Sequence, residues 1–350
     1  MTQLKITLTF LLFLSLACSI TTNLPDTTAA PQITVAPTSA AQTPGAASPT
    51  QVAQPTRPPL PQGSSQPPLT RPPLQGSAQP PLAGSQQPPL AATLTNGVNY
   101  SVTNPTSGVK LFVRVYSPVR SALSPVLVLV PGGKGDSNDF RNDPNDLTSA
   151  GFVVVTFDPD GRGQSAGTDD NDGSIHQDGL AAVIRFAATL VNVDKNKIGV
   201  ATYSYGITMG SGALARYPDL PLKFLIDWEG PANRNDTGGC TTPKSGHLQG
   251  VYACTDEAAW SQREAATFIG KLKIPYQRIQ SEKDHAQPDA HHAVTMINAA
   301  LAGGGIPLIK LNDVKITQKV ELKSLPPLIP ESQERLRGQN VAKYAQELLK

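Results

Sequence analysis

Short apolar runs, rich in branched aliphatic residues, alternate with helix-like stretches from residue 125 to the end of this 350-residue chain. Such runs are typical of strands in a parallel sheet whose two faces are both covered. We expect strands at 126–130, 152–157, 198–202, 223–228, 274–279 and 307–311. Helices are expected at 177–190, 207–216, 257–268, 288–301 and 331–349, and an antiparallel pair at 100–103 and 109–116. The alternation predicts an α/β fold with a doubly wound, mostly parallel sheet and a site at the carboxyl ends of its strands.

One serine stands where a strand gives way to a helix within a few residues. The strand 198–202 runs into Tyr203-Ser204-Tyr205-Gly206, and a helical pattern follows at once. A sharp strand-to-helix turn lifts a serine hydroxyl above the sheet, and it needs small neighbours two positions away. Gly206 meets this requirement, whereas Thr202 stands where a glycine is usual. The junction makes Ser204 the candidate nucleophile.

Together with three other segments, this junction resembles the α/β-hydrolase fold family, in particular its dienelactone-hydrolase and prolyl-oligopeptidase-like branches. Pro131-Gly132-Gly133-Lys134-Gly135 resembles the family's oxyanion loop, although Pro131 replaces the usual histidine. Residues 157–165 resemble its D-x-R-G-x-G-x-S loop, and residues 280–288 resemble its acid loop, G-x-x-D-x-x-x-P. The resemblance covers about 98–350. It implies serine-type acyl transfer without a cofactor, with the oxyanion held by the backbone N–H groups of Gly133 and Tyr205.

The catalytic histidine departs from the family pattern. The resemblance places it in the loop after the last strand, but here that loop lacks one and no histidine follows His292. We predict that His285, at the carboxyl end of strand 274–279, takes its place and acts as the base for Ser204.

The orienting acid has three candidates. Asp284 occupies the family's acid position, but adjacent residues on an extended segment point to opposite sides, which makes it a poor partner for His285. Asp227 and Glu229, at the end of strand 223–228, lie on one face by the two-residue period. We rank Ser204–Glu229–His285 first, and this triad also keeps the order Ser–acid–His. Should His285 bond only within its loop, the chain would be a catalytically inactive hydrolase fold that serves as a surface binding module.

A long segment, 229–273, separates two of the expected strands and predicts a small cap over the site. It contains Cys240 and Cys254, which we expect to form a disulfide in an extracytoplasmic protein. Trp228, Tyr252 and Trp260 supply aromatic surface for a substrate pocket or for packing of the cap. A metal site is an alternative for the acidic and histidine residues of 284–292, but the spacing matches no metal motif, so we expect no metal.

The first 95 residues predict a targeting signal followed by a tether. Lys5 and an apolar run at 6–17 indicate a signal peptide, and its end, Leu14-Ser15-Leu16-Ala17-Cys18, resembles a bacterial lipobox. We therefore expect lipidation of Cys18 and anchoring at the outer side of the cell membrane, with secretion after ordinary cleavage as the alternative. Residues 19–95 repeat a Gln-Pro-Pro-Leu unit and predict an extended, disordered spacer.

The sequence thus divides into a signal peptide (1–18), a tether (19–95) and an α/β-hydrolase domain (96–350) with a cap at about 229–273. The net charge of +2 gives no basis for nucleic-acid binding. We expect an extracytoplasmic serine hydrolase that acts on a small-molecule or peptide substrate and cleaves an ester, amide or peptide bond.

Overall fold

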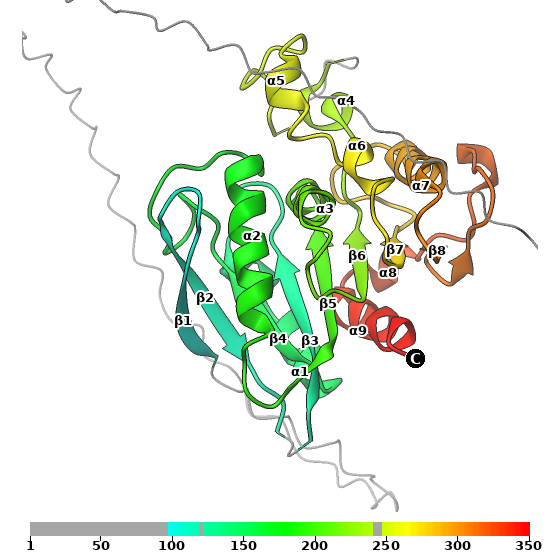
Figure 1. Cartoon of the computed structure of the whole chain (residues 1–350). Helices are drawn as coiled ribbons and strands as arrows, with labels where there is room; N and C mark the ends of the chain where they lie inside the picture. Colours follow the sequence, from blue (N-terminus) through cyan, green and yellow to red (C-terminus); the bar gives the residue numbers. More distant parts are fainter. Residues whose placement is uncertain (1–96, 120–121, 241–246) are drawn as a thin grey trace, which may run out of the picture. The chain divides into compact units, whose positions relative to one another are not determined.

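The computed structural model describes residues 97–119, 122–240 and 247–350. The predicted signal peptide and tether, with Cys18, lie outside these residues. Within the described part, one mixed sheet has the strand order β1-β2-β4-β3-β5-β6-β7-β8-β9 (Figure 1). The strands are β1 (Val98–Thr103), β2 (Lys110–Tyr116), β3 (Ser124–Val130), β4 (Val153–Phe157), β5 (Val193–Tyr203), β6 (Phe224–Trp228), β7 (Tyr276–Ile279), β8 (Ile309–Leu311) and β9 (Val314–Lys315).

Helices connect these strands. They are α1 (Asp143–Ser149), α2 (Ser174–Ala187), α3 (Gly206–Arg216), α4 (Arg234–Gly238), α5 (Glu257–Trp260), α6 (Ala265–Ile269), α7 (His291–Gly303), α8 (Glu331–Glu334) and α9 (Arg337–Leu348). Two short 3₁₀ turns, η1 (Ser137–Phe140) and η2 (Leu322–Ser324), complete the described elements. None of the described helices combines the length and the apolar character that crossing a membrane requires.

Strands β4, β3, β5, β6, β7 and β8 run parallel, while β1, β2 and β9 add antiparallel edges. From β3 the chain crosses to β4 on one side and then returns to β5 on the other side of β3. A reversal of this kind opens a crevice at the carboxyl ends of the two strands, where ligands bind in open α/β sheets. The predicted α/β fold class, with its doubly wound and mostly parallel sheet, is confirmed.

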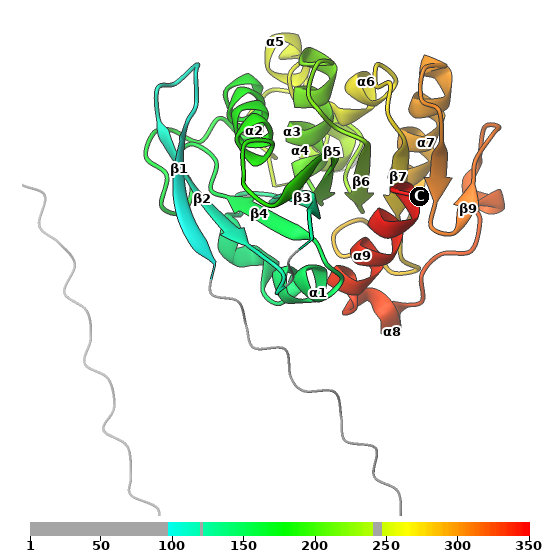
Figure 2. The same ribbon diagram turned by 60° about the horizontal axis from the view of Figure 1, so that its bottom comes forward.

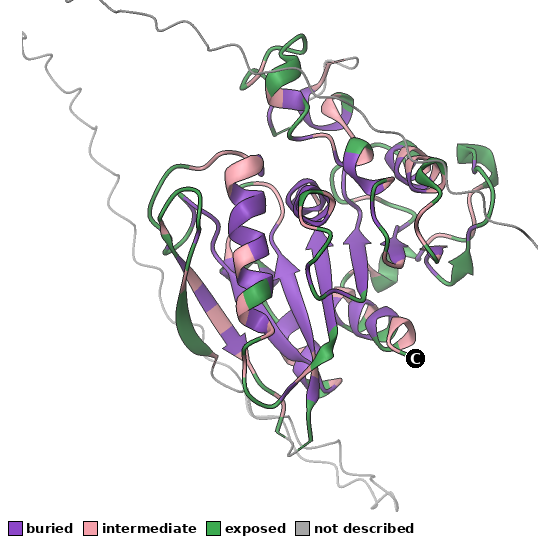
Figure 3. Ribbon diagram, viewed as in Figure 1, coloured by how far each residue is buried: buried purple, intermediate pink, exposed green. Residues whose placement is uncertain are grey.

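The apolar strands supply two cores because successive side chains point to opposite faces of the sheet. In β3, Val126, Val128 and Val130 join the core beneath α2, α3, α6 and α7. Leu127 and Leu129 join the other core, beneath α1 and α9. Figure 2 shows these two groups of helices on opposite sides of the sheet. Figure 3 shows that β3, β4 and β6 are buried along almost their whole length, whereas the first part of β5 is exposed.

The prediction of one continuous helix at 257–268 is wrong. The chain forms two short helices there, α5 and α6, with a break between them. At the break, Arg263 is buried and donates to the backbone carbonyl of Asp170 in a distant loop. Glu264 accepts from Arg234 at 2.8 Å. These tertiary contacts fix the backbone at 263–264 and outweigh the local helix propensity.

Candidate active site

A strained turn carries the candidate nucleophile. Ser204 follows β5 directly and has φ = 50°, which is costly for a residue with a side chain. Its backbone N–H donates to the carbonyl of Trp228 at 2.8 Å, which ties the turn to the end of β6. A Cβ on Gly206 would lie 2.4 Å from the carbonyl oxygen of Pro131, so a glycine is required there. The turn therefore has the strand–serine–glycine–helix geometry expected from the sequence.

The structure brings Ser204, His285 and Glu229 into one hydrogen-bonded chain. Ser204 Oγ lies 2.8 Å from His285 Nε2, and His285 Nδ1 lies 2.8 Å from Glu229 Oε2. A carboxylate only accepts, so it selects the imidazole tautomer with a proton on Nδ1. Nε2 is then free to accept the hydroxyl proton of Ser204.

Glu229 is held in place by the loop that carries the histidine. It is buried and has φ = 50°, so it leaves the strand direction immediately after Trp228. Its Oε1 accepts from the backbone N–H of Ser281 at 2.9 Å and from the Ser281 hydroxyl. Its Oε2 also accepts from the backbone N–H of His285 at 3.3 Å. The sequence reasoning missed Ser281, for which the spacing of the motifs offered no signal.

Two backbone N–H groups are available for an oxyanion. Gly133 has φ = 53° in a turn closed by a 2.8 Å hydrogen bond from the N–H of Gly135 to the carbonyl of Gly132. A Cβ on Gly132 would lie 2.8 Å from the Cβ of Ser204, which places this turn directly beside the serine. Within the described residues, neither the N–H of Gly133 nor that of Tyr205 donates a hydrogen bond. Both predicted donors are therefore free at the crevice.

Asp227, the alternative acid, does not face His285. It forms a buried ion pair with Arg278 at 2.6 Å and accepts from the Tyr276 hydroxyl at 2.7 Å. The prediction that Asp227 and Glu229 share one face is wrong, since β6 ends at Trp228 and the two-residue period does not extend to Glu229.

Asp284 also serves a different partner. Its Oδ2 lies 3.0 Å from His292 Nε2 and accepts from Gln280 at 2.9 Å. Its Oδ1 accepts from the backbone N–H groups of Ala286 and Gln287 and lies 3.6 Å from His285 Nδ1. Burial raises the pKa of Asp284, but hydrogen bonding and charge from His292 outweigh burial and hold the pKa well below its usual range. Asp284 thus shapes the loop around His285, while Glu229 holds the ring.

One group of possible metal ligands occurs in the described residues, and it consists of Glu229, Asp284 and His285. Each of their oxygen and nitrogen atoms already has a hydrogen-bonding partner in the protein. Glu229 and His285 thus belong to the hydrogen-bonded chain with Ser204, and Asp284 belongs to the loop beside it. Of the other two histidines in the predicted metal alternative, His291 pairs with Asp236 at 2.9 Å, and His292 Nε2 lies 3.0 Å from Asp284 Oδ2.

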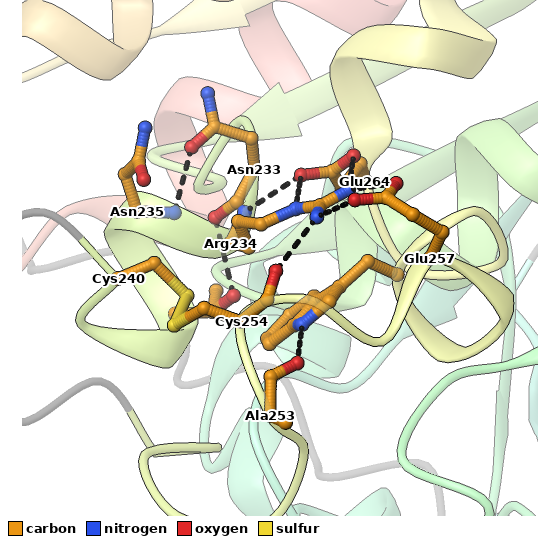
Figure 4. The surroundings of a disulfide bond; sticks show 10 residues. Asn233, Arg234, Asn235, Cys240, Ala253, Cys254, Glu257 and Glu264 are labelled. Atoms are coloured by element: carbon orange, nitrogen blue, oxygen red, sulfur yellow. Dashed lines mark hydrogen bonds and ion pairs between the residues drawn. A yellow bond between two sulfur atoms is a disulfide. The ribbon is translucent and has the colours of Figure 1, made fainter.

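The insertion between β6 and β7 carries α4, α5 and α6, and Figure 1 shows α4 and α5 beyond the carboxyl ends of the strands. The expected disulfide between Cys240 and Cys254 is present (Figure 4). Arg234 connects separate parts of this insertion, because it donates to the carbonyl of Cys254 and binds Glu257 and Glu264.

The three aromatic residues that the sequence placed near the site lie in two different environments. Trp260 is buried in a small cluster with Tyr205 and Leu248, against which Tyr252 packs. Trp228, in contrast, stacks on His285. The alternative of cap packing thus describes Tyr252 and Trp260, whereas Trp228 belongs to the site.

Solved structures share the fold at low sequence identity. Est1E from Butyrivibrio proteoclasticus, solved with bound ferulic acid, has a TM-score of 0.52 and 18% identity, covering 71% of this chain and 99% of its own. Acetyl xylan esterase 1 from Thermoanaerobacterium has a TM-score of 0.53 and 14% identity over 74% and 86%. Dipeptidyl peptidase 4 from Porphyromonas gingivalis has a TM-score of 0.53 and 16% identity over 73% of this chain but 35% of its own.

Sequence comparison gives the family. No curated protein matches the chain. The profile of the X-Pro dipeptidyl-peptidase (S15) family matches residues 107–300, a segment that runs from the start of β2 through most of α7. This match covers more than half of the chain and includes every residue of the hydrogen-bonded chain described above. The protein therefore belongs to the X-Pro dipeptidyl-peptidase (S15) family and is a serine hydrolase of the esterase or peptidase type.

Proposed function

We propose that this protein hydrolyses an ester or peptide bond through an acyl-enzyme formed on Ser204. The observation that carries the proposal is the continuous chain of two 2.8 Å hydrogen bonds from Ser204 through His285 to Glu229. His285 takes the hydroxyl proton as Ser204 Oγ attacks the substrate carbonyl. The carboxylate of Glu229 stabilises the imidazolium that forms.

The rest of the cycle follows from the same groups. The N–H groups of Gly133 and Tyr205 receive the oxyanion of the tetrahedral intermediate, an interaction that is worth about 3–4 kcal/mol per donor. The His285 imidazolium then gives its proton to the leaving group, and the acyl-enzyme remains. A water molecule, deprotonated by His285, then attacks the acyl-enzyme ester. His285 returns this proton to Ser204 Oγ as the acid is released, which restores the free enzyme.

For the substrate, we propose a small ester or a peptide with proline in the second position. The S15 family supports the peptide, and acetyl xylan esterase 1, which shares the fold, supports the ester. Both require the same nucleophile, so chromogenic Ala-Pro-anilide and short-chain nitrophenyl esters can be compared on one preparation.

We further propose that the enzyme acts outside the cytoplasmic membrane, with a lipid on Cys18 and residues 19–95 as a spacer. The lipobox-like end of the apolar run supports the anchor. A disulfide supports an oxidising compartment, because disulfides are rare in the cytosol. Metabolic labelling with palmitate, lost in Cys18→Ser, tests the lipid. An unlabelled protein in the culture medium would favour secretion instead.

Labelling of the purified protein with a fluorophosphonate probe tests the mechanism. We expect labelling of the wild type and none of Ser204→Ala or His285→Ala. Ser261→Ala serves as the matched control, because Ser261 is an exposed serine that bonds only to neighbouring backbone groups in α5. If the folded wild type were not labelled, the mechanism would be contradicted, and the alternative of a catalytically inactive surface binding module would be favoured. Labelling that survives in His285→Ala would mean that another group is the base.

A further inference from the structure

Trp228 presents an aromatic face to the proposed catalytic base. The ring centroids of Trp228 and His285 are 4.6 Å apart, and the two planes are inclined by 30°, which is a stacked arrangement. Trp228 is the last residue of β6 and is buried, with 7% of its surface exposed. It immediately precedes Glu229, so one strand end supplies both the acid and the aromatic face. Glu229 contacts Nδ1 of His285, and Trp228 contacts the plane of the same ring.

An aromatic face distinguishes the two protonation states of the histidine. The negative face of an indole attracts a cation within about 6 Å of its centroid, and tryptophan is the strongest of the aromatic side chains. His285 is neutral before the reaction and positive once it has taken the proton of Ser204. The attraction is therefore larger in the transition state than in the ground state, which is the condition for faster catalysis.

We propose that Trp228 is a positioning residue that stacks under His285 and stabilises its imidazolium form during acyl transfer. The proposal rests on the proposed function, because it takes His285 to be the base. It goes beyond the Ser204–His285–Glu229 chain by assigning a role to a residue that makes no hydrogen bond to any of the three side chains.

Three carboxylates lie around His285. Glu229 and Asp284 face Nδ1 at 2.8 and 3.6 Å. On α8, the half-buried Glu334 is also near: burial and the charge of Glu229 raise its pKa, while the charge of His285 lowers it. These neighbours are carboxylates, and Trp228 is the neutral group that contacts the ring.

A second cation reaches the same indole. The guanidinium of Arg337 lies 5.5 Å from the Trp228 centroid and 4.6 Å from that of Tyr203. Its Nε donates to Asp143 at 2.7 Å, so this carboxylate offsets its positive charge. Repulsion between Arg337 and the His285 imidazolium is thereby reduced, and the indole remains attractive to the imidazolium.

The test compares Trp228→Phe and Trp228→Leu with the wild type in nitrophenyl ester hydrolysis across pH. Leucine fills part of the volume but lacks the aromatic face, whereas phenylalanine retains a weaker one. We expect kcat to fall roughly 3–30-fold in Trp228→Leu and KM to change less than about twofold. We also expect the ascending limb of the pH profile to move to lower pH, since the protonated imidazole loses a stabilising partner. Phenylalanine should restore most of the rate.

Phe140→Leu is the matched control. Phe140 is equally buried and packs against Tyr203 with ring centroids 5.2 Å apart, but it makes no ring contact with His285. We expect this variant to lose stability without moving the pH limb. An unchanged rate in Trp228→Leu, or a slower rate with an unmoved limb, would overturn the proposal and leave only packing.

An NMR titration of the His285 imidazole separates this inference from the proposed function, since it needs no turnover. A titration midpoint that falls in Trp228→Leu would support the stabilised imidazolium even if another group proved to be the base. A midpoint that does not move would overturn the inference. Fluorophosphonate labelling of His285→Ala, in contrast, decides only the proposed function.

Discussion

Glu229→Gln is the most informative perturbation of the site, because it removes one charge and almost no volume. The Glu229 carboxylate accepts from three N–H groups and one hydroxyl: the His285 ring, the backbone of His285, and the backbone and hydroxyl of Ser281. A glutamine has one accepting oxygen and one donating NH₂, so it cannot serve all four. Either its oxygen faces Ser281 and its NH₂ faces His285, or the reverse.

The two orientations have different chemical consequences. With NH₂ toward His285, Nδ1 must accept, so the ring proton moves to Nε2 and the ring can no longer take the proton of Ser204. With NH₂ toward Ser281, the correct tautomer survives, but the backbone N–H of Ser281 loses its 2.9 Å acceptor. The first orientation sacrifices only the weaker 3.3 Å contact of the His285 N–H. The inactive tautomer is therefore favoured, by about 1 kcal/mol for the difference between the two lost hydrogen bonds.

The lost charge adds to this cost. A hydrogen bond to a charged group contributes roughly 1.5–3 kcal/mol, and the imidazolium of Glu229→Gln lacks its ionic partner. The sum is about 2.5–4 kcal/mol, which corresponds to a fall in kcat of roughly 10²–10³-fold. Steady-state hydrolysis of a nitrophenyl ester measures this fall, and a thermal melt confirms that the variant is folded.

Asp284→Asn provides the matched control, because it makes the same exchange of a carboxylate for an amide beside the same histidine. Its oxygen can still accept from the N–H groups of Ala286 and Gln287, so the loop around His285 keeps its shape. We expect kcat within about fivefold of the wild type, because Asp284 does not hold the ring. If Asp284→Asn were the slower of the two folded variants, the assignment of Glu229 as the orienting acid would be refuted.

Two further predictions concern stability. Reducing the disulfide between Cys240 and Cys254, 14 positions apart, should lower the free energy of unfolding by about 3 kcal/mol. Melts with and without a phosphine reductant measure this, with a variant in which both cysteines are replaced by serine as the control. If the reductant changed the melting temperature of the wild type as little as that of the control, the prediction would be contradicted. Burial lowers the pKa of His176, but Asp172 and Asp170 more than compensate, so the pKa is raised. Such a group contributes stability that is complete below about pH 6.5 and is lost as pH rises through the folded-state pKa. Urea melts should show His176→Gln more destabilised near pH 5.5 than near pH 8.5; equal losses would disprove the linkage.

The arrangement of the sheet was predictable because it follows from a simple physical pattern. Strands buried on both faces are apolar throughout, and β3 shows why: its alternate residues enter two different cores. The break between α5 and α6 was not predictable, since it depends on contacts of Arg263 and Glu264 with distant loops. Local propensity carries no information about such contacts.

The site divides in the same way. Ser204 stands out in the sequence because its turn needs a glycine and a strand–helix junction. The sequence ranked Glu229 first but kept Asp227 as an alternative, because no glycine indicates the positive φ that separates Glu229 from the strand. Trp228 is far from His285 along the chain, and Ser281 is near it but belongs to no known motif, so the sequence did not indicate their contacts with the site. Their roles, like those of the three residues in the hydrogen-bonded chain, stay proposals for the experiments above.

The displaced histidine has a physical basis in the order of the strands. The strands that precede Glu229 and His285, β6 and β7, lie one and two places from β5, which carries Ser204. In the proposed triad, His285 therefore reaches Ser204 from a nearer strand than β8, whose following loop holds the histidine in the related pattern. That loop now holds Asn312, whose side chain accepts from the backbone N–H of Gln280 and donates to its carbonyl, both at 3.0 Å. Since Gln280 begins the loop that leads to His285, the loop after β8 supports the segment that carries this histidine.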